Sequence, residues 1–299
     1  MAGALSRRSL LGIGGGSLAA LAGCSTAAPR PRAGTPSPQR LRYGPQAVQY
    51  GDLYRPSGTP LATVVVIHGG FWLADYALDL GAATSADLAQ RGYAAWNIEY
   101  RRLGNGGGWS TTFADVAGAI DHVARLRGLD PSRVALLGHS AGGQLATWAA
   151  TRASAPRPPG VTGSSPVRVR GVVSQAGVLD LRTAAADQVG GGVVPQLLAG
   201  LPTSVPTHYA ATDPTERAGL AVTAGVPVRC VVGSDDTTVP ATQSEAYVRA
   251  ARAAGATARL AEVVRVPGDH FALIDPSTPA WSTIVRQLKD LVGSLHALG

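Results

Sequence analysis

Short apolar runs alternate with stretches of helical pattern along most of this chain, and the alternation limits its fold more than any other feature. The runs are almost continuously apolar, as in strands that are buried on both faces of a parallel sheet. The pattern predicts an α/β fold with a mostly parallel central sheet and helices on both faces. The expected strands are residues 63–67, 93–100, 133–137, 170–175, 228–232 and 259–266, and the expected helices lie near 78–91, 113–126, 141–151, 243–254 and 281–296.

Residues 177–226 interrupt this alternation with Pro, Gly and Thr and show no clean period. They fall where a small cap could be inserted over a site at the carboxyl ends of the strands. The stretch "VQYGDLYRP" predicts short strands on the N-terminal side. The chain of 299 residues shows no repeat and no other change of composition, so residues 43–299 are expected to form one large domain.

The N-terminal sequence is typical of an export signal. It has a twin arginine at Arg7 and Arg8 and then a glycine-rich apolar stretch, residues 10–22. That stretch is shorter than the roughly 20 residues that a spanning helix prefers, so residues 1–23 are interpreted as a signal peptide. "SRRSLL" resembles a twin-arginine signal, and "LAGC" resembles the bacterial lipobox. This resemblance implies lipidation of Cys24 after cleavage before it.

Residues 24–42 would then be a lipidated cysteine and a Pro/Ser/Arg linker. The protein is expected to be exported and anchored by lipid alone to the outer face of the bacterial cytoplasmic membrane. An uncleaved anchor and an ordinary signal peptide are the alternatives. With Cys24 lipidated, Cys230 has no partner for a disulfide, and its apolar surroundings indicate a small core residue.

The net charge of +7 does not indicate a nucleic-acid partner. Residues 1–42 hold six arginines and no acid, which leaves 20 basic and 19 acidic residues in the rest of the chain. A domain that binds nucleic acid presents a strong basic surface, and this one is almost neutral. The sequence does not settle the oligomeric state.

A serine stands at the end of the third expected strand, in "VALLGHSAGGQ". Gly138-His139-Ser140-Ala141-Gly142 matches G-x-S-x-G, with a strand before it and a helix after it, which is the context of a nucleophile elbow. The glycines leave room for a tight turn, and the helix N-terminus directs free N–H groups toward developing negative charge. Ser140 is therefore the expected nucleophile.

The base and the acid are expected downstream, each after a strand. His270 follows the strand at 259–266, whereas His208 lies in the irregular segment and His296 near the end of the chain. Asp235 and Asp236 both follow the strand at 228–232, and the pattern alone leaves the choice between them open. Asp269 is read as a turn residue because an immediate neighbour of His270 is poorly directed to bond its imidazole.

Two motifs resemble those of known hydrolases. "GSDDTTVP" resembles the G-x-x-D-x-x-V-P pattern of α/β-hydrolase esterases, and this resemblance selects Asp236 as the acid. "HGGFW" resembles the HGGxW motif of the carboxylesterase-like and kynurenine formamidase-like branches of the α/β-hydrolase superfamily. It implies that the loop after residues 63–67 supplies N–H groups to an oxyanion hole, formed by Gly69, Gly70 and Phe71 together with Ala141.

The resemblance covers residues 43–297 and implies an α/β-hydrolase fold. His68 is expected to brace the oxyanion loop rather than act as a base. Trp72 and Phe71 are expected to wall the substrate pocket, with packing in the core as an equal alternative for these aromatic side chains. Asp115 and Asp180 are interpreted as structural.

The expected function is hydrolysis of a small-molecule carboxylic ester, of short-chain or aryl type, through an acyl-enzyme. An aryl formamidase would use the same groups on a formamide, and export disfavours it. A non-catalytic surface lipoprotein is the third alternative. We expect no cofactor and no metal, because the sequence has no Cys/His/Asp cluster with ligand spacing, no G-x-G-x-x-G and no P-loop.

Overall fold

The computed structural model describes residues 36–293, so the predicted signal peptide and Cys24 lie outside the described residues. Its sheet has eight strands in the order β1-β2-β4-β3-β5-β6-β7-β8. β1 and β2 are antiparallel to their neighbours, and the other strands run parallel. The bounds are β1 Gln39–Arg42, β2 Tyr50–Tyr54, β3 Thr63–Ile67, β4 Ala94–Ile98, β5 Val134–His139, β6 Val169–Gln175, β7 Val228–Gly233 and β8 Ala261–Val266.

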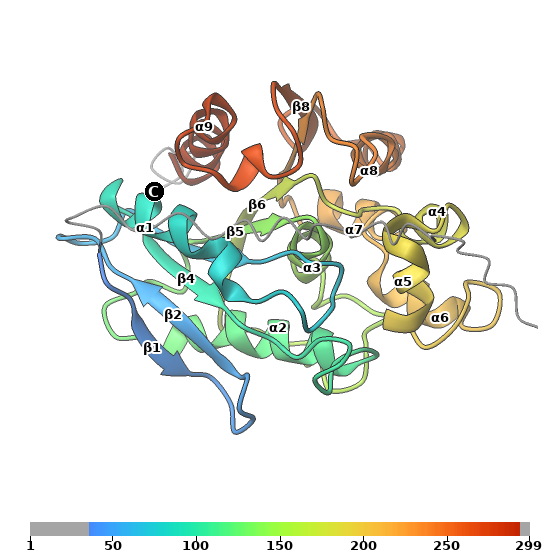
Figure 1. The fold of residues 1–299 in the computed structure, drawn as a ribbon, viewed down its shortest axis with the longest axis horizontal. Helices are drawn as coiled ribbons and strands as arrows, with labels where there is room; N and C mark the ends of the chain where they lie inside the picture. The colour runs from blue at the N-terminus through green and yellow to red at the C-terminus, as the bar shows by residue number, and fades with distance from the viewer. Residues whose placement is uncertain (1–35, 294–299) are drawn as a thin grey trace, which may run out of the picture.

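Helices cover both faces of this sheet, which confirms the predicted fold class (Figure 1). Alternate residues of β3 enter different cores: Val65 and Ile67 pack with the helices of one face, and Val64 and Val66 with those of the other. The first core includes side chains of α2 Thr111–Asp121, α3 Ala141–Ala149 and α8 Thr242–Ala253. The second includes those of α1 Ala82–Gln90 and α9 Pro279–Gly293. Short 3-10 helices are η1 Leu78–Gly81, η2 His122–Arg125 and η3 Ala272–Ile274.

The first strand corrects the predicted extent of the linker. Residues 39–42 belong to the sheet, because β1 pairs with β2 and Arg40 forms two hydrogen bonds with Asp52, of 2.8 and 2.9 Å. The polar sequence "QRLR" has no apolar pattern, and the strand depends on these partners. The structured domain thus includes residues before the predicted boundary at 43.

The segment that lacked a period, residues 177–226, forms four helices between β6 and β7: α4 Leu181–Ala186, α5 Val189–Leu197, α6 Pro206–Thr212 and α7 Ala218–Thr223. It packs beside α3, where Trp148 Nε1 donates to Ala211 O at 3.0 Å and Gln144 Nε2 donates to Thr212 O at 3.0 Å. All nine residues of α3 are buried. The insertion therefore supports the helix that follows Ser140.

The expected core cysteine lies in β7, and burial raises the pKa of the Cys230 thiol to about 12.

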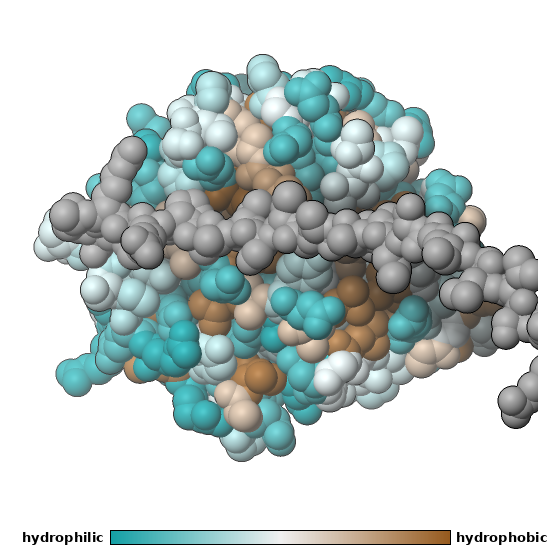
Figure 2. Space-filling view, in the orientation of Figure 1, coloured by the Kyte–Doolittle hydropathy of each residue, from teal (hydrophilic) through white to brown (hydrophobic). Residues whose placement is uncertain are grey.

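On the face shown in Figure 2, hydrophobic residues lie in separate patches among hydrophilic ones. Within residues 36–293, no helix is both long enough and apolar enough to cross a membrane.

Candidate active site

The turn between β5 and α3 holds Ser140 in a strained backbone conformation. Its φ is 55° and its ψ is −120°, a combination that costs a non-glycine residue on the order of 1–3 kcal/mol. A Cβ at Gly138 would lie 2.1 Å from Gly142 O, and one at Gly142 would lie 2.1 Å from Ile67 O. Only glycines allow the strand and helix backbones to approach so closely, as the motif predicted.

His270 and Asp236 come together from the ends of neighbouring strands. His270 Nδ1 lies 2.7 Å from Asp236 Oδ2, and both side chains are almost fully buried. Asp236 Oδ1 accepts hydrogen bonds from Thr238 N at 2.8 Å and Val239 N at 3.0 Å. Burial would raise the pKa of Asp236, but the bonds from His270, Val239 and Thr238 outweigh burial and hold that pKa below its ordinary value. The carboxylate is therefore ionised and fixes the imidazole with Nδ1 protonated.

The neighbouring acids do not take part in this pair. Asp235 is exposed. Asp269 Oδ1 accepts from Phe271 N at 3.0 Å and from Ala272 N at 2.8 Å, as a turn residue does. Of the acids that follow the last strands, the structure thus brings Asp236 to His270.

The loop after β3 lies against the serine elbow. A Cβ at Gly69 would lie 2.9 Å from Ser140 Cβ, so this residue has to be small. Phe71 and Trp72 both have positive φ, 51° and 55°, which is rare for bulky residues. In the part of the chain that the structure describes, the N–H groups of Gly70, Phe71 and Ala141 have no backbone acceptor. These groups remain available for a ligand beside Ser140.

A pocket brings the predicted residues into one site. Its total volume is about 310 Å³, which includes space that is open to solvent. Ser140 and His270 line it together with Gly70 and Phe71 of the loop. Its remaining lining residues, which the sequence pattern did not single out for this role, are Tyr76, Leu80, His139, Thr238 and Phe271.

Trp72 lies elsewhere. Its side chain is completely buried in the core cluster that also contains Trp96 and Phe113, and it is not among the residues that line the pocket. The expectation that Trp72 walls the pocket is therefore wrong in this structure, and the alternative of core packing describes it. Phe71, the other aromatic residue of the motif, does line the pocket.

His139, the variable residue of the elbow motif, supports the histidine of the pair. Its Nε2 lies 3.0 Å from His270 O, and the two rings are tilted against each other with centroids 4.5 Å apart. Burial, with a further contribution from His270, lowers the pKa of His139 to about 3. The ring is thus neutral, donates from Nε2 to the carbonyl oxygen, and adds no positive charge beside His270. Its place between Gly138 and Ser140 was the only sequence signal for it.

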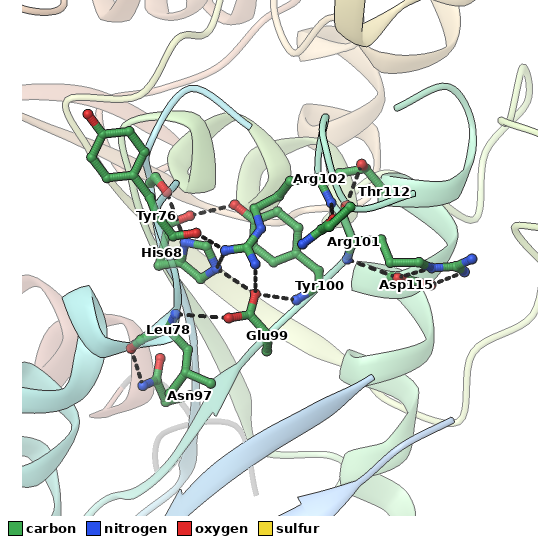
Figure 3. A network of polar contacts seen from close by, with 12 residues as sticks. His68, Tyr76, Leu78, Asn97, Glu99, Tyr100, Arg101, Arg102, Thr112 and Asp115 are labelled. Atoms are coloured by element: carbon green, nitrogen blue, oxygen red, sulfur yellow. Dashed lines mark hydrogen bonds and ion pairs between the residues drawn. The ribbon is translucent and has the colours of Figure 1, made fainter. Parts of the chain in front are cut away.

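A buried carboxylate lies at the base of the loop (Figure 3). Glu99 follows β4, and its Oε1 lies 3.2 Å from His68 Nε2 and 2.9 Å from an Arg102 guanidinium nitrogen. His68 also stacks on Tyr100, whose hydroxyl donates to His68 O at 2.8 Å. His68 is therefore held away from the pocket, in agreement with its expected bracing position.

Together these parts define the class of the protein. The serine follows β5, the acid β7 and the histidine β8, which is the chain order of the α/β-hydrolase fold. The chain belongs to the BD-FAE family, whose model matches residues 52–250. No curated protein matches the chain.

Solved structures share the fold. A truncated carbohydrate esterase from gut microbiota superposes with a TM-score of 0.70 at 21% identity, over 88% of this chain and 99% of that one. Esterase B from Lactobacillus Rhamnosis (HN001) gives 0.69 at 20% identity, over 88% of each chain. The esterase Est2 from the Planctomycetes species Thermogutta terrifontis gives 0.65 at 20% identity, over 88% of this chain and 94% of that one.

Among the described residues, no group of three or more His, Cys, Asp or Glu side chains could hold a metal ion. The chemistry available in the pocket is that of a hydroxyl, an oriented imidazole and backbone N–H groups.

Proposed function

We propose that this protein is a serine hydrolase that cleaves carboxylic esters through an acyl-enzyme. The observation that carries the proposal is the 2.7 Å contact between His270 Nδ1 and Asp236 Oδ2 beside a pocket that Ser140 also lines. Asp236 leaves the Nε2 of His270 free to act as a base, since it fixes Nδ1 in the protonated form. The family and the fold support the same reaction class.

In the proposed reaction, Ser140 Oγ attacks the ester carbonyl carbon while His270 takes the hydroxyl proton. The carbonyl oxygen becomes an oxyanion, which accepts hydrogen bonds from N–H groups of Gly70, Phe71 and Ala141. Each such donor contributes about 2.7–4 kcal/mol to transition-state stabilisation in a comparable enzyme. His270 returns the proton to the departing alcohol, then activates water, and the acid is released as Ser140 is restored.

The proposed substrates carry short acyl groups. The pocket is small, and the bulky Phe71 is among the residues that line it. Two of the structural neighbours have been solved with short-chain ligands: esterase B with a C4-C4 tributyrin phosphonate, and the Thermogutta esterase with butyrate. These ligands are properties of those proteins and support the same size class here.

The test of the nucleophile is Ser140→Ala. We expect this variant to lose ester turnover and labelling by a serine-directed phosphonate while it keeps the thermal stability of the wild type. Labelling of the variant at the rate of the wild type would exclude Ser140 as the nucleophile.

We also propose that the domain is exported and tethered by a lipid on Cys24. The support is the twin arginine and "LAGC" in the sequence. Mass spectrometry of the protein purified from membranes should find a lipid on Cys24, and Cys24→Ser should leave the protein unprocessed or release it from membranes. An unmodified Cys24 in the native protein would rule the tether out.

A further inference from the structure

The two ends of the oxyanion loop, residues 68–78, meet at one carboxylate. Glu99 Oε1 lies 3.2 Å from His68 Nε2 at the start of the loop. Glu99 Oε2 accepts a hydrogen bond of 3.2 Å from Leu78 N at its end. Figure 3 shows both contacts as dashed lines from Glu99. A single side chain thus joins the first and last residues of the segment that carries Gly70 and Phe71.

The position of Glu99 follows from strand pairing. β3 and β4 run parallel with Ile67 beside Ile98, so the residues that come next, His68 and Glu99, are neighbours at the same edge of the sheet.

Arg102 extends the contact to the pocket wall. Its guanidinium lies 2.9 Å from Glu99 Oε1 and donates to the carbonyl oxygen of Tyr76, a residue that lines the pocket. The same carboxylate oxygen accepts from Tyr100 N at 2.9 Å. Glu99 therefore fixes the loop at three places: directly at His68 and Leu78, and through Arg102 at Tyr76.

The carboxylate is charged in this buried position. Burial would raise the pKa of Glu99, but the bond from His68, the charge of Arg102 and the N–H of Tyr100 outweigh it, and the pKa lies below its ordinary value. Glu99 and Arg102 are 1% and 3% exposed, so water cannot take the place of either partner. Removing one partner of such a buried pair leaves the other charge uncompensated.

The loop must be held accurately because it touches the nucleophile. Gly69 lies so close to Ser140 that a Cβ would come within 2.9 Å of Ser140 Cβ. Hydrogen bonds aimed at a developing oxyanion lose most of their effect when the donors move by a fraction of an ångström. A shift of residues 68–78 would displace the Gly70 and Phe71 N–H groups relative to the attacked carbonyl.

We infer that Glu99 is a positioning residue that clamps both ends of the oxyanion loop and thereby sets kcat, without touching the substrate. The inference rests on the proposed function. Backbone bonds in the middle of the loop, from Leu103 N to Trp72 O and from Ala74 N to Leu103 O, keep the loop in place when the clamp is removed. Without the Glu99 carboxylate, the loop is therefore more mobile but still folded.

The test compares Glu99→Gln with a matched control, Asp115→Asn. Asp115 is also a buried carboxylate with an arginine partner, 2.7 Å from Arg101, and it accepts from Arg101 N at 3.0 Å and Gln49 Nε2 at 2.6 Å. Its bonds go to residues outside the loop (Figure 3). Both substitutions replace a buried carboxylate by an amide of similar size, so both are expected to lower the melting temperature.

Only Glu99→Gln should also lower kcat, by about 10- to 100-fold, with KM nearly unchanged, because the oxyanion donors act in the transition state. Hydrogen exchange of peptides that cover residues 68–78 should be faster in Glu99→Gln and unchanged in Asp115→Asn. Equal losses of kcat in the two variants, or unchanged exchange of the loop in Glu99→Gln, would overturn the inference. If the wild type hydrolyses no ester, the proposed function fails, and the exchange measurement still decides whether the clamp exists.

Discussion

His270 Nδ1 and Asp236 Oδ2 are 2.7 Å apart, whereas the adjacent Asp235 is exposed to solvent. Two consecutive aspartates therefore have different environments although their chemistry is the same. The difference comes from the turn after β7, where the N–H groups of Thr238 and Val239 hold the Asp236 carboxylate in place. This contrast makes the two aspartates a matched pair for mutation.

Asp236→Asn should lower kcat far more than Asp235→Asn. An amide in place of the carboxylate no longer selects the tautomer of His270 that leaves Nε2 free, and the corresponding change in a serine protease costs about 10⁴-fold. Steady-state kinetics on a short aryl ester measures both variants. A larger loss of kcat in Asp235→Asn would contradict the assignment of the orienting role to Asp236.

The same carboxylate should make stability depend on pH. Asp236 has a folded-state pKa below its ordinary value, so its stabilising contribution is present above that ordinary value, near pH 4. The contribution is lost as the pH falls through the folded-state pKa. At pH 7 the free energy of unfolding should be about 1.5–3 kcal/mol higher for the wild type than for Asp236→Asn. This difference in free energy should decrease as the pH falls below about 4. Urea unfolding at a series of pH values measures it, and a gap that is constant down to pH 3 would contradict the prediction.

The sheet could be predicted from the sequence because its strands are buried on both faces. β3 has the predicted bounds, and all five of its residues are buried. β1 could not be predicted, because "QRLR" becomes a strand only through β2 and Asp52. The helices of the insertion could not be predicted from a helical pattern, because a run of glycines at 190–192 interrupts it. None of the insertion's residues lines the pocket.

The local motifs placed Ser140, His270 and Asp236 near one another, since each follows a parallel strand. The orientation of Trp72 was not predictable, because a positive φ at a tryptophan has no signal in the sequence. Glu99 was missed for a different reason. Its role depends on β4 lying beside β3, and strand order is a property of the folded sheet.

Gly190 of the insertion lies close to the Phe71 ring of the oxyanion loop, and a glycine substitution can test this contact. A Cβ at Gly190 would lie 2.3 Å from Phe71 Cδ1, and the residue has a φ of 65°. Gly191 has a similar φ, 71°, and nothing lies within 4 Å of its added Cβ. Alanine at either position imposes roughly 1–2 kcal/mol of backbone strain, but only Gly190→Ala displaces Phe71. We expect Gly190→Ala to lower kcat/KM about tenfold or more and Gly191→Ala to leave it within about threefold, at similar losses of melting temperature. Similar kcat/KM values for the two variants would contradict this prediction. They would show that the Phe71 side chain can move aside while its backbone N–H stays in place.

The size of the pocket leads to the prediction about substrates. Aryl acetates and butyrates should be cleaved with higher kcat/KM than esters of long acyl chains or N-formylkynurenine. Phe71 and Leu80 line the pocket with Ser140, and a chain too long for it must extend toward solvent, where Tyr76 and Phe271 of its lining are exposed. Each methylene that is excluded changes the activation free energy by about 1–3 kcal/mol, so the decline should begin within a few carbons. Phe71→Ala should widen the range of accepted chains, because it removes a bulky side chain that lines the pocket and keeps the backbone N–H. A panel of p-nitrophenyl esters from acetate to palmitate, run on both proteins with N-formylkynurenine as the amide comparison, gives the answer. Faster turnover of N-formylkynurenine than of every short ester would make the formamidase the better assignment.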